Sequence, residues 1–229
     1  MDPTDRTGGA AAREGVPVLL VAVDGIDLAG KSTLIEATVH ELGERGVSAA
    51  RHRGMLTERH PLDRPLRRLS LARQQDSAFT TTAYLFAGFA LDNVLARLRP
   101  PLHEGCAVLI QDGYVDRTVA FGIAGGPYLA ARAALRWPGL FAPCDLAVHV
   151  TADIGARARR LDAGRDHIDV RDERSARDEP FSDRFHQALA AIGRRHRRLI
   201  TIDTTDRDPA ETAGELAGTI LALLSRAAR

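Results

Sequence analysis

The sequence predicts an α/β fold in which helices cover both faces of a five-stranded parallel sheet. Short apolar segments alternate with segments of helical periodicity along the chain, a pattern typical of parallel sheets. The length of 229 residues and the 45% hydrophobic content suffice for one sizeable core. No internal repeat or linker divides the sequence, so residues 16–229 are predicted to form a single domain.

The N-terminal half contains the first two predicted strands. Residues 17–24 are apolar and rich in Val, which fits a strand buried on both faces. A helix then begins at Lys31, carries apolar residues at helical spacing, and ends at Gly46. The next expected elements are a strand at 46–53, a helix at 63–75 and a strongly apolar helix at 80–100.

The C-terminal half supplies three further strands. The predicted strands are 106–112, 144–151 and 199–203, and the predicted helices are 127–137, 152–161, 181–199 and 209–226. Residues 162–180 are rich in Asp, Arg and Glu and poor in apolar residues, so we expect a mobile, solvated flap. Cys106 and Cys144 open two strands and are expected to be small buried hydrophobic residues rather than metal ligands or a disulfide.

Charge and hydropathy exclude several classes of protein. The formal net charge is only +1, so no global field attracts nucleic acid or a membrane surface. No apolar run approaches the roughly 20 residues of a membrane span. Residues 1–15 mix acidic and basic residues without an apolar centre, which excludes a secretory signal and predicts a disordered tail. We therefore expect a cytoplasmic protein without nucleic-acid or membrane partners.

The most specific motif is a phosphate-binding loop at residues 25–32. Its sequence GIDLAGKS matches GxxxxGK[ST] between a predicted strand and a predicted helix, which predicts a P-loop NTPase fold. Glycines let backbone amides approach phosphate oxygens, and the helix N-terminus adds partial positive charge. The Ser32 hydroxyl is a candidate ligand for Mg²⁺. The expected ATP-contacting residues of the loop are Gly25, Asp27, Leu28, Ala29, Gly30, Lys31, Ser32 and Thr33.

Lys31 is the sole lysine of the chain, beside thirty arginines. An ammonium is a compact point charge that can bridge the β- and γ-phosphates, whereas a planar guanidinium presents its donors in a fixed fork. Retention of lysine here alone favours a phosphate-binding role. It also disfavours a regulatory GTPase, because the short guanine-reading motif of those proteins needs a second lysine.

Several segments resemble the thymidylate kinase family. The similarity lies in DGIDLAGKST at 24–33, FALDN at 89–93, VLIQDGYVDRTVAF at 108–121, PCDLAVHVTADIGARARR at 143–160 and LITIDTTDRDPAE at 199–211. The resemblance covers about residues 17–225, with these segments in the family's order. The resemblance implies Mg²⁺-dependent transfer of the γ-phosphoryl group of ATP to a nucleoside monophosphate, dTMP or a modified nucleotide, by a homodimer.

The resemblance also implies roles for individual residues. Asp24 and Asp27 take the acidic positions on either side of the first loop glycine, with Asp27 near the metal and the acceptor phosphate. Asp112 would hold Mg²⁺ together with Ser32. Phe89 would stack on the acceptor base, and Tyr114 keeps the aromatic residue of the family's Asp-Arg-Tyr run.

A short arginine-rich lid is expected at about residues 157–179. Some members place a basic residue inside the phosphate loop, but the chain has Leu28 there, so the resemblance implies a catalytic arginine in the lid. The candidates are Arg160 and Arg165, because a closing arginine can stabilise transferring phosphate. Arg157 is instead a candidate to stack on adenine.

The chain departs from the family on the acceptor side, which leaves three interpretations. Gly113 replaces the arginine that grips the acceptor phosphate, Asn93 replaces the base-reading arginine, and Phe121 replaces a tyrosine. In the first interpretation the acceptor keeps its phosphate, Arg53 or Arg117 supplies the missing guanidinium, and the amide of Asn93 hydrogen-bonds a base edge.

In the second interpretation the acceptor has no phosphate. The enzyme would then phosphorylate a hydroxyl of a nucleoside or another small molecule, with Asp112 or Asp116 as general base. In the third, the chain is a nucleotide-binding protein without turnover, which the intact donor-side residues disfavour.

Overall fold

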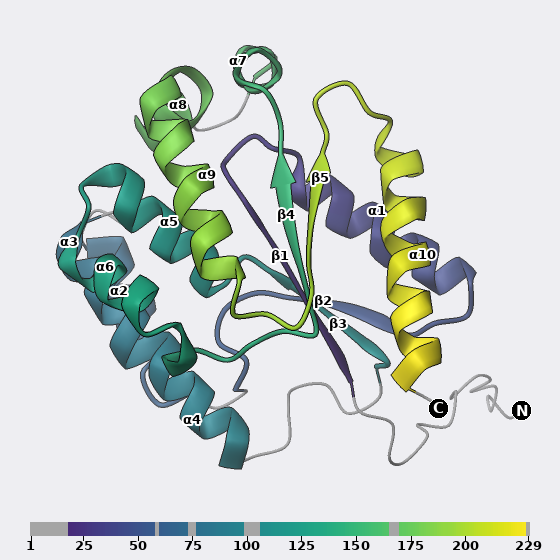
Figure 1. The fold of residues 1–229 in the computed structure, drawn as a ribbon, viewed down its shortest axis with the longest axis horizontal. Coiled ribbons are helices and arrows are strands. Elements are labelled where there is room, and N and C mark those ends of the chain that lie inside the picture. The colour runs from purple at the N-terminus through teal and green to yellow at the C-terminus, as the bar shows by residue number, and fades with distance from the viewer. Residues whose placement is uncertain (1–17, 58–59, 73–76, 99–105, 165–169, 228–229) are drawn as a thin grey trace, which may run out of the picture.

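The computed structural model describes residues 18–57, 60–72, 77–98, 106–164 and 170–227. A parallel sheet of five strands lies at the centre, in the order β2-β3-β1-β4-β5 (Figure 1). The strands are β1 (Leu19–Gly25), β2 (Ala49–His52), β3 (Val108–Asp112), β4 (Leu146–Thr151) and β5 (Leu199–Asp203). The predicted α/β class and parallel sheet are confirmed. The predicted tail at 1–15 lies outside the described residues.

The register of the central strands brings their carboxyl ends to one edge of the sheet. Val23 of β1 pairs with Asp112 at the end of β3, and Gly25 pairs with Val150 near the end of β4. In open parallel sheets ligands bind outside this edge. The segments that follow β1, β3 and β4 are therefore placed to build a site together.

Helices cover both faces of the sheet. Helices α1 and α10 lie on one side, and α5 and α9 lie on the other (Figure 1). The helical elements are α1 (Lys31–Glu44), α2 (Asp63–Ala72), α3 (Ala78–Thr82), η1 (Ala83–Ala90), α4 (Leu91–Leu98), α5 (Val115–Gly125), α6 (Leu129–Arg136), η2 (Pro138–Leu140), α7 (Ile154–Asp162), α8 (Val170–Arg177), α9 (Glu179–Gly193) and α10 (Pro209–Ala227). None of these helices is long and apolar enough to cross a membrane.

The main core lies between the central strands and their covering helices. Val21, Val23 and Val148 are fully buried there, with Phe185 of α9 and Ile220 of α10. A second apolar cluster joins η1, α5 and α6. Because the central strands are apolar on both faces, their burial between two helical layers follows from the sequence.

Several segments differ from the sequence-based expectation. No helix was predicted at 115–125, where the structure has α5. The apolar helix predicted at 80–100 contains a π-helical stretch, η1, between α3 and α4. Within the segment predicted to be a solvated flap, α8 is an ordered helix that buries Ser175 and Ala176. The prediction of a solvated segment is therefore wrong for this helix, which also buries Asp172. Cys144 is buried as predicted, while Cys106 is only partly buried.

Replacement of Gly25 by alanine is expected to destabilise the fold. A Cβ at Gly25 would lie 2.3 Å from the carbonyl oxygen of Val150 on β4, and a paired strand cannot move away without losing its hydrogen bonds. We expect a loss of about 1–3 kcal/mol, the usual cost of overpacking, measured by urea unfolding. Gly43→Ala is the matched control, because no atom lies within 4 Å of its Cβ position; equal effects of both substitutions would contradict the prediction.

Candidate active site

The phosphate-binding loop connects β1 to α1. Leu28 and Gly30 adopt left-handed backbone angles, with φ of 69° and 82°, and Leu34 N donates to Gly30 O at the start of α1. Lys31 folds back over the loop, where its Nζ donates to Ile26 O at 2.6 Å. This places the ammonium inside the bend where a polyphosphate would bind.

Burial changes the acidity of Lys31. Removal from water lowers the pKa of its ammonium to about 8, even though the carboxylate of Asp27, 4.0 Å away, opposes this effect. An anionic ligand would favour the charged ammonium. The loop therefore has a cation whose charge depends on what is bound.

Arg51, which was not predicted from the sequence to be a site residue, contacts both Ser32 and Asp112. Arg51 donates to Asp112 through Nε at 3.0 Å and through Nη2, and Nη2 also lies 3.4 Å from Ser32 Oγ. Arg53 adds a contact of 2.6 Å from Nε to Asp112 Oδ2. Burial alone would raise the pKa of Asp112, but the hydrogen bonds from both arginines lower it.

The donor chemistry at this corner fits Mg²⁺. Magnesium uses one or two protein oxygens and completes its shell with waters and phosphates, so one carboxylate and one hydroxyl are enough. Among the described residues no group of three or more His, Cys, Asp or Glu could hold a metal. Ser32 and Asp112 would hold the ion only if Arg51, which lies between them, moves aside.

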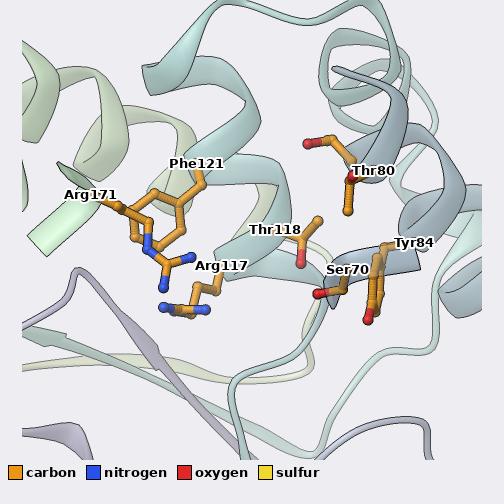
Figure 2. Close-up of a pocket in the computed structure, with 8 residues that line it drawn as sticks. Ser70, Thr80, Tyr84, Arg117, Thr118, Phe121 and Arg171 are labelled. Carbon is orange, nitrogen blue, oxygen red and sulfur yellow. The ribbon is translucent and has the colours of Figure 1, made fainter. Parts of the chain in front are cut away.

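One cavity, here called the arginine cavity, has a volume of about 260 Å³ (Figure 2). Two arginines lie towards one side, and hydroxyl-bearing side chains lie towards the other (Figure 2). Its lining residues are Ser70, Thr80, Thr81, Tyr84, Arg117, Thr118, Phe121 and Arg171. Sequence reasoning had identified Arg117 and Phe121, and had named Arg53 as the alternative to Arg117.

Asp27 joins the phosphate-binding loop to both arginines of this cavity. Arg117 Nη2 donates to Asp27 Oδ1 at 2.7 Å, and Arg171 Nε lies 2.9 Å from Oδ2. Burial would raise the pKa of Asp27, but Arg117, Lys31 and Arg171 together hold it well below its usual range. The carboxylate is therefore charged at any pH at which the protein would be assayed.

A second cavity, here called the α10 cavity, lies beside the loop and has a volume of about 360 Å³. Its lining residues are Leu28, Gly30, Thr33, Leu34, Arg160, Gly164, Thr204, Arg207, Pro209 and Thr212. Arg160 donates to Leu28 O at 3.0 Å and to Thr204 O at 2.6 Å. The loop thus lines the α10 cavity and, through Asp27, contacts both arginines of the arginine cavity, an arrangement suited to transfer between two ligands.

Comparison with known proteins agrees with this geometry. No protein-family model matches the chain. The chain is 30% identical over 180 residues to a protein named thymidylate kinase from Clavibacter sepedonicus, covering 78% of the chain and 81% of that protein. It is 29% identical over 192 residues to a thymidylate kinase from Clavibacter michiganensis subsp. michiganensis, covering 82% and 87%. A third thymidylate kinase, from Symbiobacterium thermophilum, is 32% identical over 112 residues, covering 47% and 50%.

The chain belongs to the thymidylate kinase family. It is therefore a phosphotransferase of the nucleoside monophosphate kinase type. The site combines a phosphate-binding loop with two nearby cavities, and of the departures from the family only Phe121 is among the residues that line the arginine cavity.

Three residues expected on the acceptor side do not line this cavity. Phe89 and Tyr114 pack against each other in the core, with ring centroids 4.8 Å apart. Asn93 Nδ2 donates to Leu140 O at 2.9 Å, so its amide is used within the fold. Tyr84, which had not been predicted, is a second aromatic residue that lines the cavity, together with Phe121.

Asp92, next to Asn93, explains why Tyr114 is held inward. Its carboxylate accepts from Tyr114 Oη at 2.6 Å and from the backbone N–H groups of Leu56 and Thr57. A buried carboxylate with three donors is strongly held. No signal in the sequence separated Asp92 from other acidic residues.

Asp24 and Gly113 shape the turn after β3. Asp24 is buried, and its Oδ1 accepts from Tyr114 N at 3.0 Å. Burial raises the pKa of Asp24, and the nearby charge of Asp116 adds to this. Gly113 has a φ of 72°, so the residue in the family's arginine position here lies in a turn that favours glycine.

Asp116 does not face either cavity. It is 1% exposed and contacts Arg195, His196 at 2.8 Å and His149 at 3.5 Å. Both carboxylate oxygens are occupied, so the structure does not support Asp116 as the general base of the second interpretation.

The lid arginines occupy different environments. Arg157 is 2% exposed and donates to Ser182 Oγ at 2.7 Å, and burial lowers its pKa; it does not line the α10 cavity, where Arg207 is found instead. Arg165 lies outside the described residues. Arg171, within the segment predicted to be a flap, was missed because its many charged neighbours look equivalent in sequence.

The affinity for ATP is expected to fall as the pH rises through about 8. Below this pH Lys31 is already charged in the free protein, whereas above it binding must take up a proton. The loss should approach tenfold per pH unit, measured by calorimetry with Mg-ATP from pH 7.5 to 9.5. Lys31→Met should bind weakly with no such slope; an equal slope in this variant would show that another group titrates.

Arg160→Ala is expected to weaken the binding of Mg-ATP about tenfold, because the guanidinium bonds hold Leu28 O and Thr204 O beside the α10 cavity. Arg159→Ala is the control, since Arg159 is exposed and contacts Asp206 at 3.6 Å. Calorimetry distinguishes this positioning role from a purely catalytic one. If Arg160 contacts only the transition state, the affinity for ATP will not change.

Proposed function

We propose that the chain is an ATP- and Mg²⁺-dependent kinase that transfers the γ-phosphoryl group to a nucleoside monophosphate, dTMP or a modified nucleotide. The observation that carries this proposal is the position of Arg117. Its guanidinium lines the arginine cavity and contacts Asp27 of the phosphate-binding loop at 2.7 Å. It can supply the positive charge that Gly113 lacks, one helical turn further along the chain.

The geometry around the loop supports the remaining proposed roles. Lys31 and the loop amides bind the donor phosphates, and the α10 cavity takes the adenosine part of ATP. Ser32 and Asp112 hold Mg²⁺, which when bound neutralises phosphate charge. Arg53, 66% exposed at its side chain, remains at the metal corner with Asp112. The proposed unit is a single kinase domain at 16–229 with its lid at about 157–179.

Phosphorylation of a hydroxyl is the second candidate, with Asp112 as the base. Two arginines in the arginine cavity argue against it, because a neutral acceptor gives no reason to gather cations there. Asp112 itself is held by Arg51 and Arg53 at a lowered pKa, which makes it a weaker proton acceptor.

We also propose that the protein forms a homodimer. Large apolar side chains are exposed along α3, η1, α4 and the segment around α6. These are Phe79, Phe86, Val94, Leu98, Leu129 and Trp137. Apolar surface of this kind is typical of association sites. A monomeric mass in light scattering at assay concentration would contradict the proposal.

A panel of acceptors tests the proposed function. The protein is incubated with ATP, Mg²⁺ and a series of nucleosides and nucleoside monophosphates while ADP release is followed. We expect turnover with at least one monophosphate and none with the nucleosides. Arg117→Gln should raise the KM for the monophosphate about 10- to 100-fold, the usual effect of losing a charge-assisted hydrogen bond.

The panel has one control in the phosphate-binding loop and one on the surface outside the site. Lys31→Ala should abolish turnover, and Arg132→Gln, an exposed position on α6, should leave the KM unchanged. Turnover of nucleosides alone would establish the hydroxyl-kinase alternative. Binding of ATP without turnover of any acceptor would favour a non-catalytic nucleotide-binding protein.

A further inference from the structure

Two arginines from distant parts of the sequence converge on one carboxylate. Arg117 lies in the first turn of α5 and contacts Asp27 Oδ1, and Arg171 lies in the first turn of α8 and contacts Asp27 Oδ2. The two oxygens of Asp27 thus each face a different guanidinium. The same carboxylate lies 4.0 Å from Lys31 Nζ.

The two guanidinium groups also share a platform. Their central carbons lie 4.8 Å and 5.1 Å from the ring centroid of Phe121, for Arg117 and Arg171 respectively. Both side chains line the arginine cavity and lie next to each other beside Phe121 (Figure 2). Aromatic rings stabilise cations above their faces, so Phe121 holds both arginines close together despite their like charge.

Asp27 does not use all the donors that surround it. Arg117 Nε is buried and has no hydrogen-bond partner among the residues that the structure describes. A buried donor without a partner is unfavourable. A phosphomonoester carries up to two negative charges and three acceptor oxygens, so it can engage two guanidinium forks more fully than one carboxylate can.

We propose that Arg117 and Arg171 form the subsite for the phosphate of the acceptor, and that Asp27 fills this subsite as an internal anion until the acceptor binds. The inference rests on the proposed function, in which the acceptor is a monophosphate. The incoming phosphate takes over both guanidinium groups, and Asp27 is left with Lys31, whose Nζ lies 4.0 Å from its Oδ1. Arg171 thereby connects the lid helix α8 to occupancy of the acceptor site.

The alternative is that Asp27 only orients the two arginines. The two possibilities predict opposite effects of Asp27→Asn. An internal anion competes with the ligand, so its removal should strengthen phosphate binding at least threefold. An orienting residue helps the ligand, so its removal should weaken binding.

Methyl phosphate is the appropriate probe, because it is a phosphomonoester without sugar or base. It is titrated into the full-length protein with the donor site saturated by Mg²⁺ and a non-hydrolysable ATP analogue, and binding is followed by ³¹P NMR. We expect Arg117→Gln and Arg171→Gln each to weaken binding about tenfold or more. Arg171→Lys should have an intermediate effect, since it keeps the charge and loses the fork.

Arg177→Gln is the matched control on the same helix, because Arg177 is exposed and pairs with Asp162. Thermal unfolding of every variant identifies any loss of folding. Weaker binding by a folded Asp27→Asn variant, or unchanged binding by Arg171→Gln, would overturn the inference. Should these variants behave as expected while no nucleoside monophosphate is turned over, the anion subsite stands and the proposed acceptor class fails.

Discussion

The carboxylate of Asp27 is the interaction on which the arrangement of the site depends. Its ion pairs join the phosphate-binding loop to α5 through Arg117 and to α8 through Arg171. These three segments are far apart in sequence. Because a charge buried away from water needs a partner, the largely buried carboxylate of Asp27 holds both arginines beside it. The positions of the lid helix and of the cavity wall are therefore both tied to one loop residue.

Leu28, the next residue, makes the complementary apolar connection. It has a φ of 69° and is buried against Leu161 of α7 and Ala176 of α8. Asp27 thus binds the lid by charge, and Leu28 binds it by packing. A neutral residue at this place leaves the loop without a cation of its own beyond Lys31. The arginines around the loop come instead from α5, α7 and α8, which is consistent with the implied use of lid rather than loop arginines.

The sequence predicted the parts of the fold that depend on local patterns. Apolar strands, the phosphate-binding loop and its helix follow from spacing within about twenty residues. Arg171 could not be predicted, because which of many charged residues forms a buried pair depends on how α8 packs. Phe89 and Asn93 were expected at the site because FALDN resembles a segment of the family, and such a resemblance does not say which helical face meets a cavity and which meets the core. The π-helical hydrogen bonds of η1 also change the directions of its side chains relative to those of an α-helix.

Two consecutive residues of α5 point in opposite directions, and the first of them anchors the helix in the core. Asp116 points into the core. It contacts Arg195 and His196, which follow α9, and His149 of β4. Arg117 points the other way, into the arginine cavity. The buried network therefore fixes the helix that presents Arg117, whereas Arg171 is presented by a short helix joined to the loop through Leu28 and Asp27. An anion between the two arginines would thus meet one cation held by the core and one held by the loop, so binding there is coupled to the loop that holds the donor.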